Sequence, residues 1–524
     1  MIGTSLIAPK MYNIVWEIEK FASTNKLALK WVCSKGETHQ ISYKDLYNKV
    51  HQYAFTFKNN GLEKGDKLFV MMPRCVETYA VYLAILKIGC VIVPGSELLT
   101  LKDILYRIEH SEVKAIVAHN EYLNTFNSIV KGGKYKLFTI HEENGVWISL
   151  NEQAISGAHV LTVETKSDDL AFISYTSGTT GNPKGVVHTH SWGYAHIRTV
   201  ASSWLDVTED DIVWATAGPG WQKWIWSPFL ATLGSGATGF FFEGKFEAKT
   251  FLTLLKEHDI SVFCSTPTEY RFMAKEENLE MYDLPSLRSA VSAGEPLNLE
   301  VIRTFKKYFQ VDVRDGYGQT ENTLLIGTMK DIKAKEGSMG IPTPGNLVDI
   351  VDDHGIPVGV NQVGNIGVHI KSPALFKHYY NDLERTNAQI KGDYYLTGDR
   401  AKKDEDGYYW FDGRSDDIII SSGYTIGPFE IEDALVQHKL VKECAVVASP
   451  DPLRGNVVKA FIVLTENPTN PEELIKELQD HVKSVTAPYK YPRKIEFVQE
   501  LPKTISGKIR RVELRAMEDV RESN

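Results

Sequence analysis

The sequence predicts an α/β protein: a large N-terminal domain of doubly wound βα subdomains plus a small β unit, then a small α+β C-terminal domain. The chain has 524 residues, enough for several packed units, because one domain typically holds about 100–200 residues. Short apolar runs alternate with helical spacing through the first half of the chain. This alternation is typical of parallel βαβ units.

The alternation of predicted strands and helices is clearest in the N-terminal half of the chain. An apolar run at 68–72 precedes a helical pattern at 77–87, and further apolar runs follow after turn residues. Apolar runs this short indicate buried strands of a parallel sheet. The expected strands are 68–72, 90–94, 113–119 and the runs that begin at Leu170, Ile260 and Leu287.

The amino-acid composition changes at Gly337, where glycine, proline and β-branched residues become frequent. Such a composition predicts short strands joined by tight turns, here a β-rich subdomain at about 330–415. We expect an N-terminal domain at 1–415 and a C-terminal domain at 417–524, divided in the polar stretch at Asp416. The C-terminal elements expected are a helix at 430–438, strands at 443–449 and 457–464, a helix at 471–485 and a strand at 494–499.

Composition and charge exclude several classes of protein. The formal net charge is −9 with 43% hydrophobic and 24% charged residues, the wrong sign for coating nucleic acid or an anionic membrane. No stretch resembles a signal peptide or reaches the ~20 apolar residues of a membrane span. The five cysteines are odd in number and contain no CxxC pair, so we expect reduced thiols and a cytoplasmic protein.

A glycine- and hydroxyl-rich loop follows the strand that begins at Leu170. Its sequence, YTSGTTGNPKG, can turn several N–H and O–H groups toward one anion, with Lys184 adding charge. It does not match the P-loop GxxxxGK[ST], because Pro183 replaces the second glycine and Gly185 replaces the metal-binding Ser/Thr. The candidate phosphate ligands are Thr176, Ser177, Gly178, Thr179, Thr180, Gly181 and Lys184.

Further motifs follow in a fixed order. They are SAGEPL at 292–297, GYGQTE at 316–321, YLTGD at 395–399, GRSDD at 413–417 and SGKIRR at 506–511. Together with the loop, they resemble the adenylate-forming superfamily, which includes the acyl-CoA synthetases. The segments GPGWQKWIWSP and SSGYTIGPFEIE are most similar to the acetyl- and medium-chain acyl-CoA synthetase branch.

The resemblance implies an AMP-forming ligase that uses ATP, Mg²⁺ and CoA. A carboxylate attacks the α-phosphate of ATP, and CoA then displaces AMP from the acyl-adenylate. Lys508 matches the adenylation lysine, Thr320 and Glu321 are implied in catalysis, and Glu321 matches the magnesium ligand. The residues implied in binding ATP or AMP are Gly294, Glu295, Pro296, Asp315, Gly316, Tyr317, Gly318, Gln319, Asp399 and Arg414. For Asp399 and Arg414, an exposed salt bridge is the alternative.

The C-terminal domain is implied to be mobile, with its hinge at Asp416. Ser422 and Gly423 match the segment that lines the pantetheine channel, while Thr425 stands where many members carry arginine. From Lys483 to Arg515 there are nine Lys/Arg and three Glu, a basic stretch inside an acidic protein. The candidates for the CoA phosphates are Lys483 and Lys490, with Arg493 and Lys494; a solvated basic helix face explains the same charges.

The resemblance also bears on the acid. Acetate-specific relatives carry tryptophan after the aromatic residue of the adenine motif, whereas this chain carries Gly318, and Trp221 matches the pocket wall of medium-chain enzymes. We therefore expect a short branched-chain, medium-chain or aryl-like acid rather than acetate. Two alternatives stay open: an adenylation enzyme that loads a carrier protein, and a non-catalytic nucleotide-binding protein. Either a monomer or a homodimer is compatible with the sequence.

Overall fold

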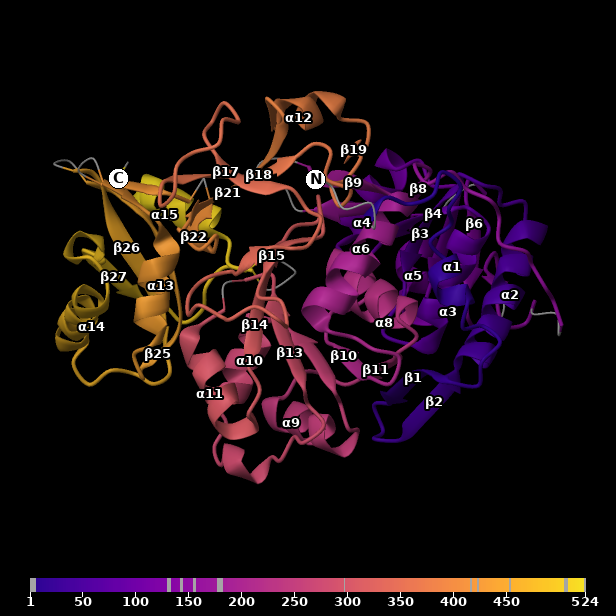
Figure 1. Ribbon diagram of the computed structural model, residues 1–524, viewed down its shortest axis with the longest axis horizontal. Helices are drawn as coiled ribbons and strands as arrows, with labels where there is room; N and C mark the ends of the chain where they lie inside the picture. Colours follow the sequence, from indigo (N-terminus) through magenta and orange to yellow (C-terminus); the bar gives the residue numbers. More distant parts are fainter. Residues whose placement is uncertain are drawn as a thin grey trace. The chain divides into compact units, whose positions relative to one another are not determined.

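The chain folds as two units in the computed structural model. The first comprises Met1–Val348 and Val368–Gln389, and the second comprises Asp349–Gly367 and Ile390–Asn524. Each unit is built from strands and helices (Figure 1). The residues that the structure describes are 6–129, 133–141, 145–153, 157–176, 182–295, 297–414, 417–421, 424–451, 454–503 and 508–522.

The first unit contains a nine-stranded sheet in the order β16-β15-β14-β13-β12-β10-β11-β1-β2. From β14 to β1 neighbouring strands run parallel, whereas β15, β16 and β2 at the two edges are antiparallel to their neighbours. The bounds are β1 Leu27–Val32, β2 Thr38–Ser42, β10 Ile212–Ala215, β11 Thr238–Phe242, β12 Val262–Ser265, β13 Ser289–Ala293, β14 Val313–Gly318, β15 Leu324–Gly327 and β16 Ile341–Pro342.

The same unit contains an eight-stranded sheet in the order β19-β9-β8-β4-β3-β5-β6-β7. Strands β8 to β7 along this order are parallel, and β9 and β19 are antiparallel additions at one edge. The bounds are β3 Lys67–Met71, β4 Val91–Pro94, β5 Ala115–Ala118, β6 Lys136–Thr139, β7 Ile148–Ser149, β8 Leu170–Thr176, β9 Lys184–Thr189 and β19 His378–Tyr379.

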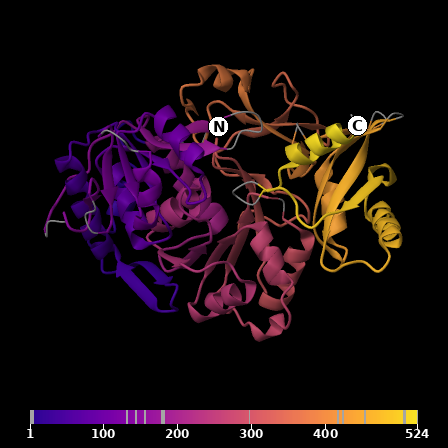
Figure 2. The ribbon, with the colours of Figure 1, turned by 180° about the vertical axis from the view of Figure 1, so that it is seen from behind.

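Helices cover both faces of each sheet. Alternate strand residues point to opposite faces, and accordingly Val213 belongs to the core with α2 and α3, while Trp214 belongs to the core with α9 and α11. On the eight-stranded sheet, Leu68 faces α2 and α3, whereas Phe69 faces α4 and α5. Figure 2 shows the same layers from behind. The predicted doubly wound α/β fold is therefore confirmed for this unit.

The helices of the first unit range from single turns to five turns. Two segments form π-helices: η3 Ile197–Leu205 and η4 Ile225–Ala231. The remaining bounds are α1 Trp16–Glu19, α2 Tyr43–Asn59, α3 Val76–Lys87, α4 Leu101–His110, η2 Asn120–Tyr122, α5 Leu123–Asn127, α6 His190–His196, α7 Gln222–Trp224, α8 Thr232–Gly234, α9 Ala248–Glu257, α10 Pro267–Ala274, η5 Leu279–Met281, α11 Leu299–Phe309 and α12 Leu383–Ala388.

The second unit contains three small sheets. A five-stranded sheet has the order β17-β18-β21-β20 with β22 paired to β21, β23 pairs with β24, and a three-stranded sheet has the order β25-β26-β27. The bounds are β17 Val348–Val351, β18 Val363–His369, β20 Ile390–Lys391, β21 Tyr394–Lys403, β22 Tyr409–Arg414, β23 Ile419–Ser421, β24 Tyr424–Ile426, β25 Val441–Asp451, β26 Gly455–Leu464, β27 Lys494–Phe497, α13 Pro428–Val436, α14 Pro471–Val485, η6 Pro488–Lys490 and α15 Arg511–Glu522.

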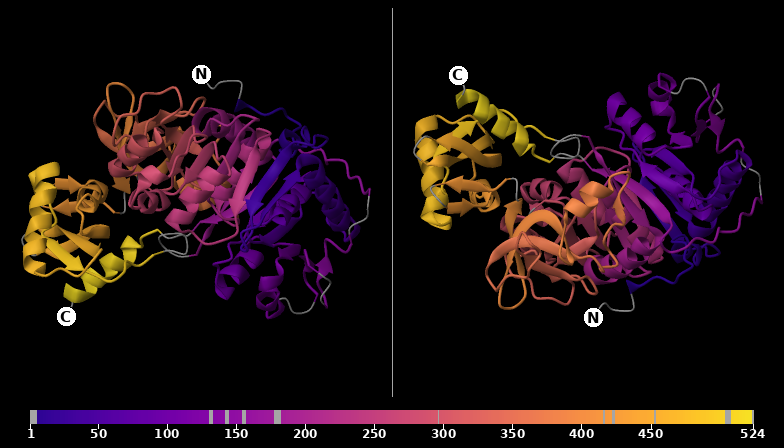
Figure 3. Two further views of the ribbon diagram at one scale, coloured as in Figure 1. Left: turned by 90° about the horizontal axis from the view of Figure 1, so that it is seen from below. Right: turned by 90° about the horizontal axis from the view of Figure 1, so that it is seen from above.

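Helices sandwich the three-stranded sheet of the second unit (Figure 3). Val446 packs in the cluster that includes residues of α13 and α14, whereas Val447 packs in the cluster that includes Leu514 of α15. This α+β arrangement agrees with the elements predicted from 430 onward. Helix α14 matches its predicted range, because Asn470 caps it and Pro471 occupies its first turn.

The two units do not divide the chain where the sequence boundary was placed. The five-stranded sheet, which lies within the predicted β-rich subdomain, groups with the C-terminal elements. Asp416, the predicted hinge, lies outside the described residues, so a functional boundary there stays a prediction. Among the described residues, no helix is long and apolar enough to cross a membrane.

Candidate active site

The segment that follows β14 is held at three successive carbonyl groups. Residues 319–323 connect β14 to β15 and carry part of the GYGQTE motif. The three bonds run from His188 Nε2 to the Thr320 oxygen (2.6 Å), from the Phe376 N–H to the Glu321 oxygen (2.7 Å) and from Trp192 Nε1 to the Asn322 oxygen (3.3 Å). The backbone of the two predicted catalytic residues is therefore fixed by the fold itself, which is the condition for preorganised catalysis.

Two buried histidines of β9 and α6 contribute to this support. Burial lowers the pKa of His188 to about 3 and that of His196 to about 4. Since Nε2 of His196 bonds the Trp226 carbonyl at 3.0 Å and its Nδ1 pairs with the Thr323 hydroxyl, its proton lies on Nε2. Both imidazoles are neutral near pH 7 and bind as single tautomers.

The Glu321 carboxylate is buried and engaged. The phenol of Tyr379, on β19, donates a hydrogen bond of 2.8 Å to Glu321 Oε1. The Lys184 ammonium lies 5.1 Å from the centroid of the Tyr379 ring. Tyr379 thus contacts one residue of the phosphate-loop motif and one of the GYGQTE motif. Tyr379 lies in none of the motifs recognised in the sequence.

The phosphate-loop motif connects two antiparallel strands. Thr176 at the end of β8 pairs with Lys184 at the start of β9, so the motif begins and ends on two paired strands. A P-loop instead joins a strand to a helix, which agrees with the rejection of that motif. The predicted phosphate ligands Ser177, Gly178, Thr179, Thr180 and Gly181 lie outside the described residues.

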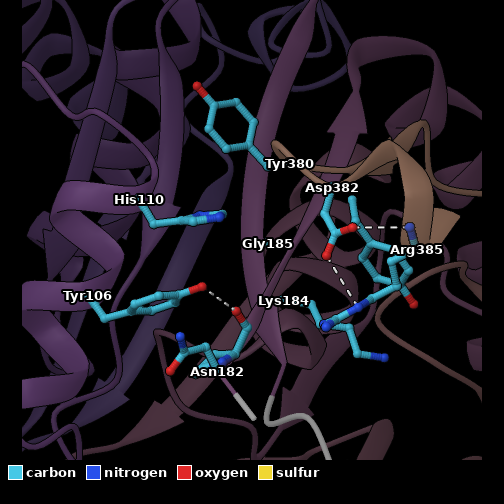
Figure 4. Close-up of a pocket in the computed structure, with 10 residues that line it drawn as sticks. Tyr106, His110, Asn182, Lys184, Gly185, Tyr380, Asp382 and Arg385 are labelled. Carbon is cyan, nitrogen blue, oxygen red and sulfur yellow. Dashed lines mark hydrogen bonds and ion pairs between the residues drawn. The ribbon is translucent and has the colours of Figure 1, made fainter. Parts of the chain in front are cut away.

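A polar pocket of about 250 Å³ lies beside strand β9. Figure 4 shows Tyr106 and His110 on one side and Lys184, Asp382 and Arg385 on the other. Arg385 pairs with Asp382 at 3.2 Å, and Lys184 is a further charged residue of the lining. Its lining residues are Tyr106, His110, Asn182, Pro183, Lys184, Gly185, Tyr379, Tyr380, Asp382 and Arg385.

The two predicted adenine-framing segments leave adjacent parallel strands. Ser292 pairs with Asp315 and Ala293 with Gly316 across β13 and β14, so Gly294 and Tyr317 follow at the same edge of the sheet. The carboxyl ends of parallel strands are where open α/β sheets bind ligands. The structure thus places residues of these two motifs side by side. Pro296 lies outside the described residues.

Side chains stabilise the segment that carries Gly294 and Glu295. The Lys223 ammonium donates to the Ala293 carbonyl oxygen, and Glu295 accepts a hydrogen bond of 2.8 Å from Thr268.

Burial raises the pKa of Asp315 to about 7. Part of the Asp315 population is consequently protonated at neutral pH, which sequence reasoning did not anticipate.

Gly318 lies in a crowded position. A Cβ added there would be 2.3 Å from the Thr323 carbonyl oxygen and 3.0 Å from the Trp226 ring. Trp226 therefore forms the wall beside Gly318. Trp221, predicted as a pocket wall, is half-buried at the start of α7, and Trp224 is core, packed against Tyr82.

In the second unit, Asp399 and Arg414 form an ion pair. They are opposite each other in β21 and β22, with Arg414 Nε 3.7 Å from Asp399 Oδ1. The side chain of Asp399 is only 8% exposed and that of Arg414 is 48% exposed. The ion pair thus joins a buried carboxylate to an exposed guanidinium, and the ribose role of these two residues stays a prediction.

Lys508 is exposed next to an anchored helix start. Arg511, at the first position of α15, binds Glu432 with Nη2 2.7 Å from Oε2. Glu432 is buried and also accepts the N–H of Val446 at 2.8 Å. The SGKIRR motif therefore joins a buried ion pair to a solvent-facing lysine three residues earlier.

The predicted CoA-binding lysines have acidic partners. Lys483 Nζ lies 2.8 Å from Asp480 Oδ1, and Lys490 pairs with Glu430. Lys494 donates to the Ser449 hydroxyl at 2.9 Å, and Arg493 to the Tyr491 hydroxyl at 2.7 Å. The channel residues Ser422 and Gly423 and the Thr425 side chain lie outside what is described.

Comparison with known proteins identifies the family. The family model described as AMP-binding enzyme matches residues 18–380, and the AMP-binding enzyme C-terminal domain matches 430–508. The chain belongs to the AMP-binding enzyme family. An acyl-CoA ligase of Bacillus subtilis strain 168, YtcI, is 57% identical over 520 residues, which cover 99% of this chain and 98% of that protein. The mouse mitochondrial acyl-coenzyme A synthetase ACSM3 is 41% identical over 505 residues, covering 94% and 86%.

Solved structures of this AMP-binding family agree with the fold. The anthranilate CoA ligase AuaEII in complex with anthranoyl-AMP has a TM-score of 0.90 at 29% identity, covering 99% of both chains. A benzoate CoA ligase from Burkholderia xenovorans LB400 has a TM-score of 0.84 at 28% identity, covering 96% of this chain and 100% of that one.

The AMP-binding enzyme is thus an acyl-CoA synthetase, an AMP-forming ligase, and the predicted family, fold and enzyme class are confirmed. Its family joins a small-molecule acid to CoA with ATP, so the use of ATP and CoA follows. Two supporting residues were missed by the sequence analysis, His188 and Tyr379. Both hold the GYGQTE segment through tertiary contacts. The sequence around each residue indicated a strand next to a helix but did not indicate a contact with this segment.

Proposed function

We propose that this acyl-CoA synthetase activates a short branched-chain or medium-chain carboxylic acid rather than acetate. Gly318 is the observation that carries this proposal. A Cβ at this position would lie 2.3 Å from the Thr323 carbonyl oxygen, so the closing tryptophan of acetate-specific relatives does not fit. The half-buried Trp221 and the Trp226 ring supply apolar walls for a longer acyl chain.

The structural neighbours suggest an alternative class of acid substrate. Two of them are ligases of anthranilate and benzoate, both aromatic acids. An aryl acid is compatible with walls built from tryptophan rings. The substrate panel below therefore includes benzoate.

Two displacements make up the proposed reaction. A carboxylate oxygen of the acid forms a bond to the α-phosphorus of ATP, and the bond from that phosphorus to the β-phosphate oxygen breaks to release pyrophosphate. The CoA thiolate then attacks the acyl carbon and AMP leaves with its oxygen. Lys508 is the cation that we assign to the first step, because an ammonium stabilises the negative charge crowded at the α-phosphate.

The remaining nucleotide contacts follow the motifs. Lys184, Gln319 and Thr320 serve the phosphates, residues 294–296 and 315–317 frame adenine, and Asp399 with Arg414 holds the ribose. The placement of Ala293 and Gly316 opposite each other supports a shared adenine site at this sheet edge. The buried carboxylate of Asp399 suits the two ribose hydroxyls, which are hydrogen-bond donors.

Mg²⁺ is part of the proposal, with Glu321 as its protein ligand. A carboxylate is the hard oxygen donor that Mg²⁺ takes, and Mg²⁺ on ATP would neutralise phosphate charge. The Glu321 carboxylate fits this role because the 2.8 Å hydrogen bond from Tyr379 fixes its orientation. No further protein ligand is needed, since Mg²⁺ is usually bound by one or two carboxylates plus phosphates.

We assign the CoA site to the second unit and place the protein in the cytoplasm. Ser422 and Gly423 would line the thiol channel, and Lys483 and Lys490 would meet CoA phosphates after exchanging their present acidic partners. Asp416 would serve as the hinge between the half-reactions. Cys33, Cys75, Cys90, Cys264 and Cys444 are free thiols, which supports a reducing compartment.

A substrate panel tests the function. Purified protein with ATP, Mg²⁺ and CoA is given acetate, C4–C8 straight-chain acids, branched C4–C5 acids, benzoate and palmitate, and pyrophosphate release is measured. We expect C4–C8 or branched acids to give the highest kcat/KM. A preference for acetate or palmitate would overturn the assignment, and a preference for benzoate would shift it to aryl acids. Replacement of CoA by a holo-carrier protein distinguishes the carrier-loading alternative.

A further inference from the structure

Tyr379 is a buried residue that contacts two predicted parts of the site at once. The residue is 1% exposed. Its hydroxyl donates to Glu321 Oε1 at 2.8 Å, and the Lys184 ammonium lies 5.1 Å from its ring centroid. An ammonium over a tyrosine ring is attracted by the ring quadrupole. Tyr379 therefore connects the candidate magnesium ligand with the phosphate-loop lysine.

The backbone around Tyr379 is fixed on two sides. Tyr379 pairs with Val186 in the antiparallel contact of β19 with β9, and its N–H donates to Thr386 Oγ1 at 3.0 Å. Three residues earlier, the N–H of Phe376 binds the Glu321 carbonyl oxygen at 2.7 Å. Residue 321 is thus held by one short segment through both its backbone and its carboxylate.

We infer that Tyr379 is a positioning residue for the adenylation half-reaction, acting on Glu321 through its hydroxyl and on Lys184 through its ring. The inference rests on the proposed roles of Glu321 and Lys184. A hydrogen bond to one carboxylate oxygen fixes the rotation of the group, so the other oxygen is presented in one direction. A ligand that is already oriented costs less to organise when metal and ATP bind.

The variant Tyr379→Phe removes the hydroxyl and keeps the ring that faces Lys184. Tyr122→Phe is the matched control, because Tyr122 donates a similar hydrogen bond of 3.0 Å to the carboxylate of Glu97, outside the motifs. The adenylation rate in a single turnover is expected to fall ~10- to 100-fold in Tyr379→Phe, the effect of losing a hydrogen bond to a charged group. Thioester formation from preformed acyl-adenylate and CoA is expected to stay near the wild-type rate, as are both steps in Tyr122→Phe.

A binding measurement complements the kinetics. Mn²⁺ replaces Mg²⁺ and is titrated by electron paramagnetic resonance in the presence of a non-hydrolysable ATP analogue. Tyr379→Phe is expected to bind the ion about 10-fold more weakly, within the range seen when a residue that orients a metal ligand is lost. Thermal melting of each variant verifies that the protein measured is folded, and phenylalanine preserves the buried volume.

The double variant separates this inference from the function on which it rests. If Tyr379 acts through Glu321, Tyr379→Phe adds little to Glu321→Gln, because residues of one unit are not additive. Wild-type adenylation in Glu321→Gln would refute the metal role of Glu321 itself. Impaired Glu321→Gln together with a Tyr379→Phe protein that behaves like Tyr122→Phe would overturn only the positioning role. Equal losses in both half-reactions, or additive losses, would also overturn it.

Discussion

The substitution Gly318→Ala tests how closely the catalytic segment packs on β14. The new Cβ would lie 2.3 Å from the Thr323 carbonyl oxygen. Carbon–oxygen contacts below 3.0 Å are essentially never seen at Cβ atoms, so one side must move by about 0.7 Å, the shortfall between the two distances. The atom in the way belongs to the backbone, and the displacement therefore reaches the loop that carries Thr320 and Glu321. We expect a loss of stability of about 1–3 kcal/mol, as in other overpacked sites.

The kinetic effect is expected to be similar in free energy to the effect on stability. A misplacement of about 1 Å at a reacting group can lower the rate ~10²-fold, so adenylation is expected to fall by roughly one to two orders of magnitude. Pyrophosphate release in a single turnover measures this rate, and thermal melting measures stability. Gly359→Ala is the control, since its Cβ would meet Gln362 at an ordinary 3.4 Å. A Gly318→Ala protein with wild-type adenylation would refute the close-packing argument.

The remaining predictions concern Lys508 and Asp315. Lys508→Ala is expected to lower the adenylation rate ~10²- to 10³-fold, the range for loss of one group that stabilises transition-state charge. The rate of thioester formation from preformed adenylate should be unchanged. Adenylation at the wild-type rate would contradict the assignment. Burial raises the pKa of Asp315 from 3.8 to about 7, so the native state keeps a proton that the unfolded state releases, and stability should decline as pH rises from about 4 to 7. Asp315→Asn should lack this decline; parallel melting-temperature curves for the two proteins between pH 4.5 and 8 would argue against it.

The sequence predicted those elements whose pattern is local. Helix α14 has a cap residue, a proline in its first turn and an amphipathic stripe, and its range was predicted without error. Helix α15 was not predicted. Its residues Arg511–Glu522 are mostly charged. Leu514 packs in one cluster with Val447, and ion pairs of Arg511 with Glu432 and of Glu518 with Lys459 also hold the helix. Its helical structure therefore depends on tertiary packing more than on local pattern.

In the candidate site, too, the sequence predicted residues in local motifs and did not predict tertiary contacts. Motif order led to Glu321, Asp399 and Lys508, because each lies in a short string of unusual composition. It did not lead to Tyr379, which lies on a two-residue strand and reaches Glu321 only because β19 adds to the edge of the eight-stranded sheet. Contacts of this kind depend on which strand edges meet, and a single sequence carries no periodic signal for them.

The two histidines that hold the predicted catalytic segment are uncharged, and this affects how the enzyme should respond to pH. His188 and His196 hold the segment through uncharged hydrogen bonds, since burial lowers the pKa of His188 to about 3 and that of His196 to about 4. A charged imidazole at either place would add a positive charge beside residues 320–323, and this charge would be lost as pH rises. Neutral imidazoles instead give the same geometry from pH 5 upward. Changes in adenylation rate near neutral pH must then come from groups that titrate there, and Asp315 is such a group in the motif segments.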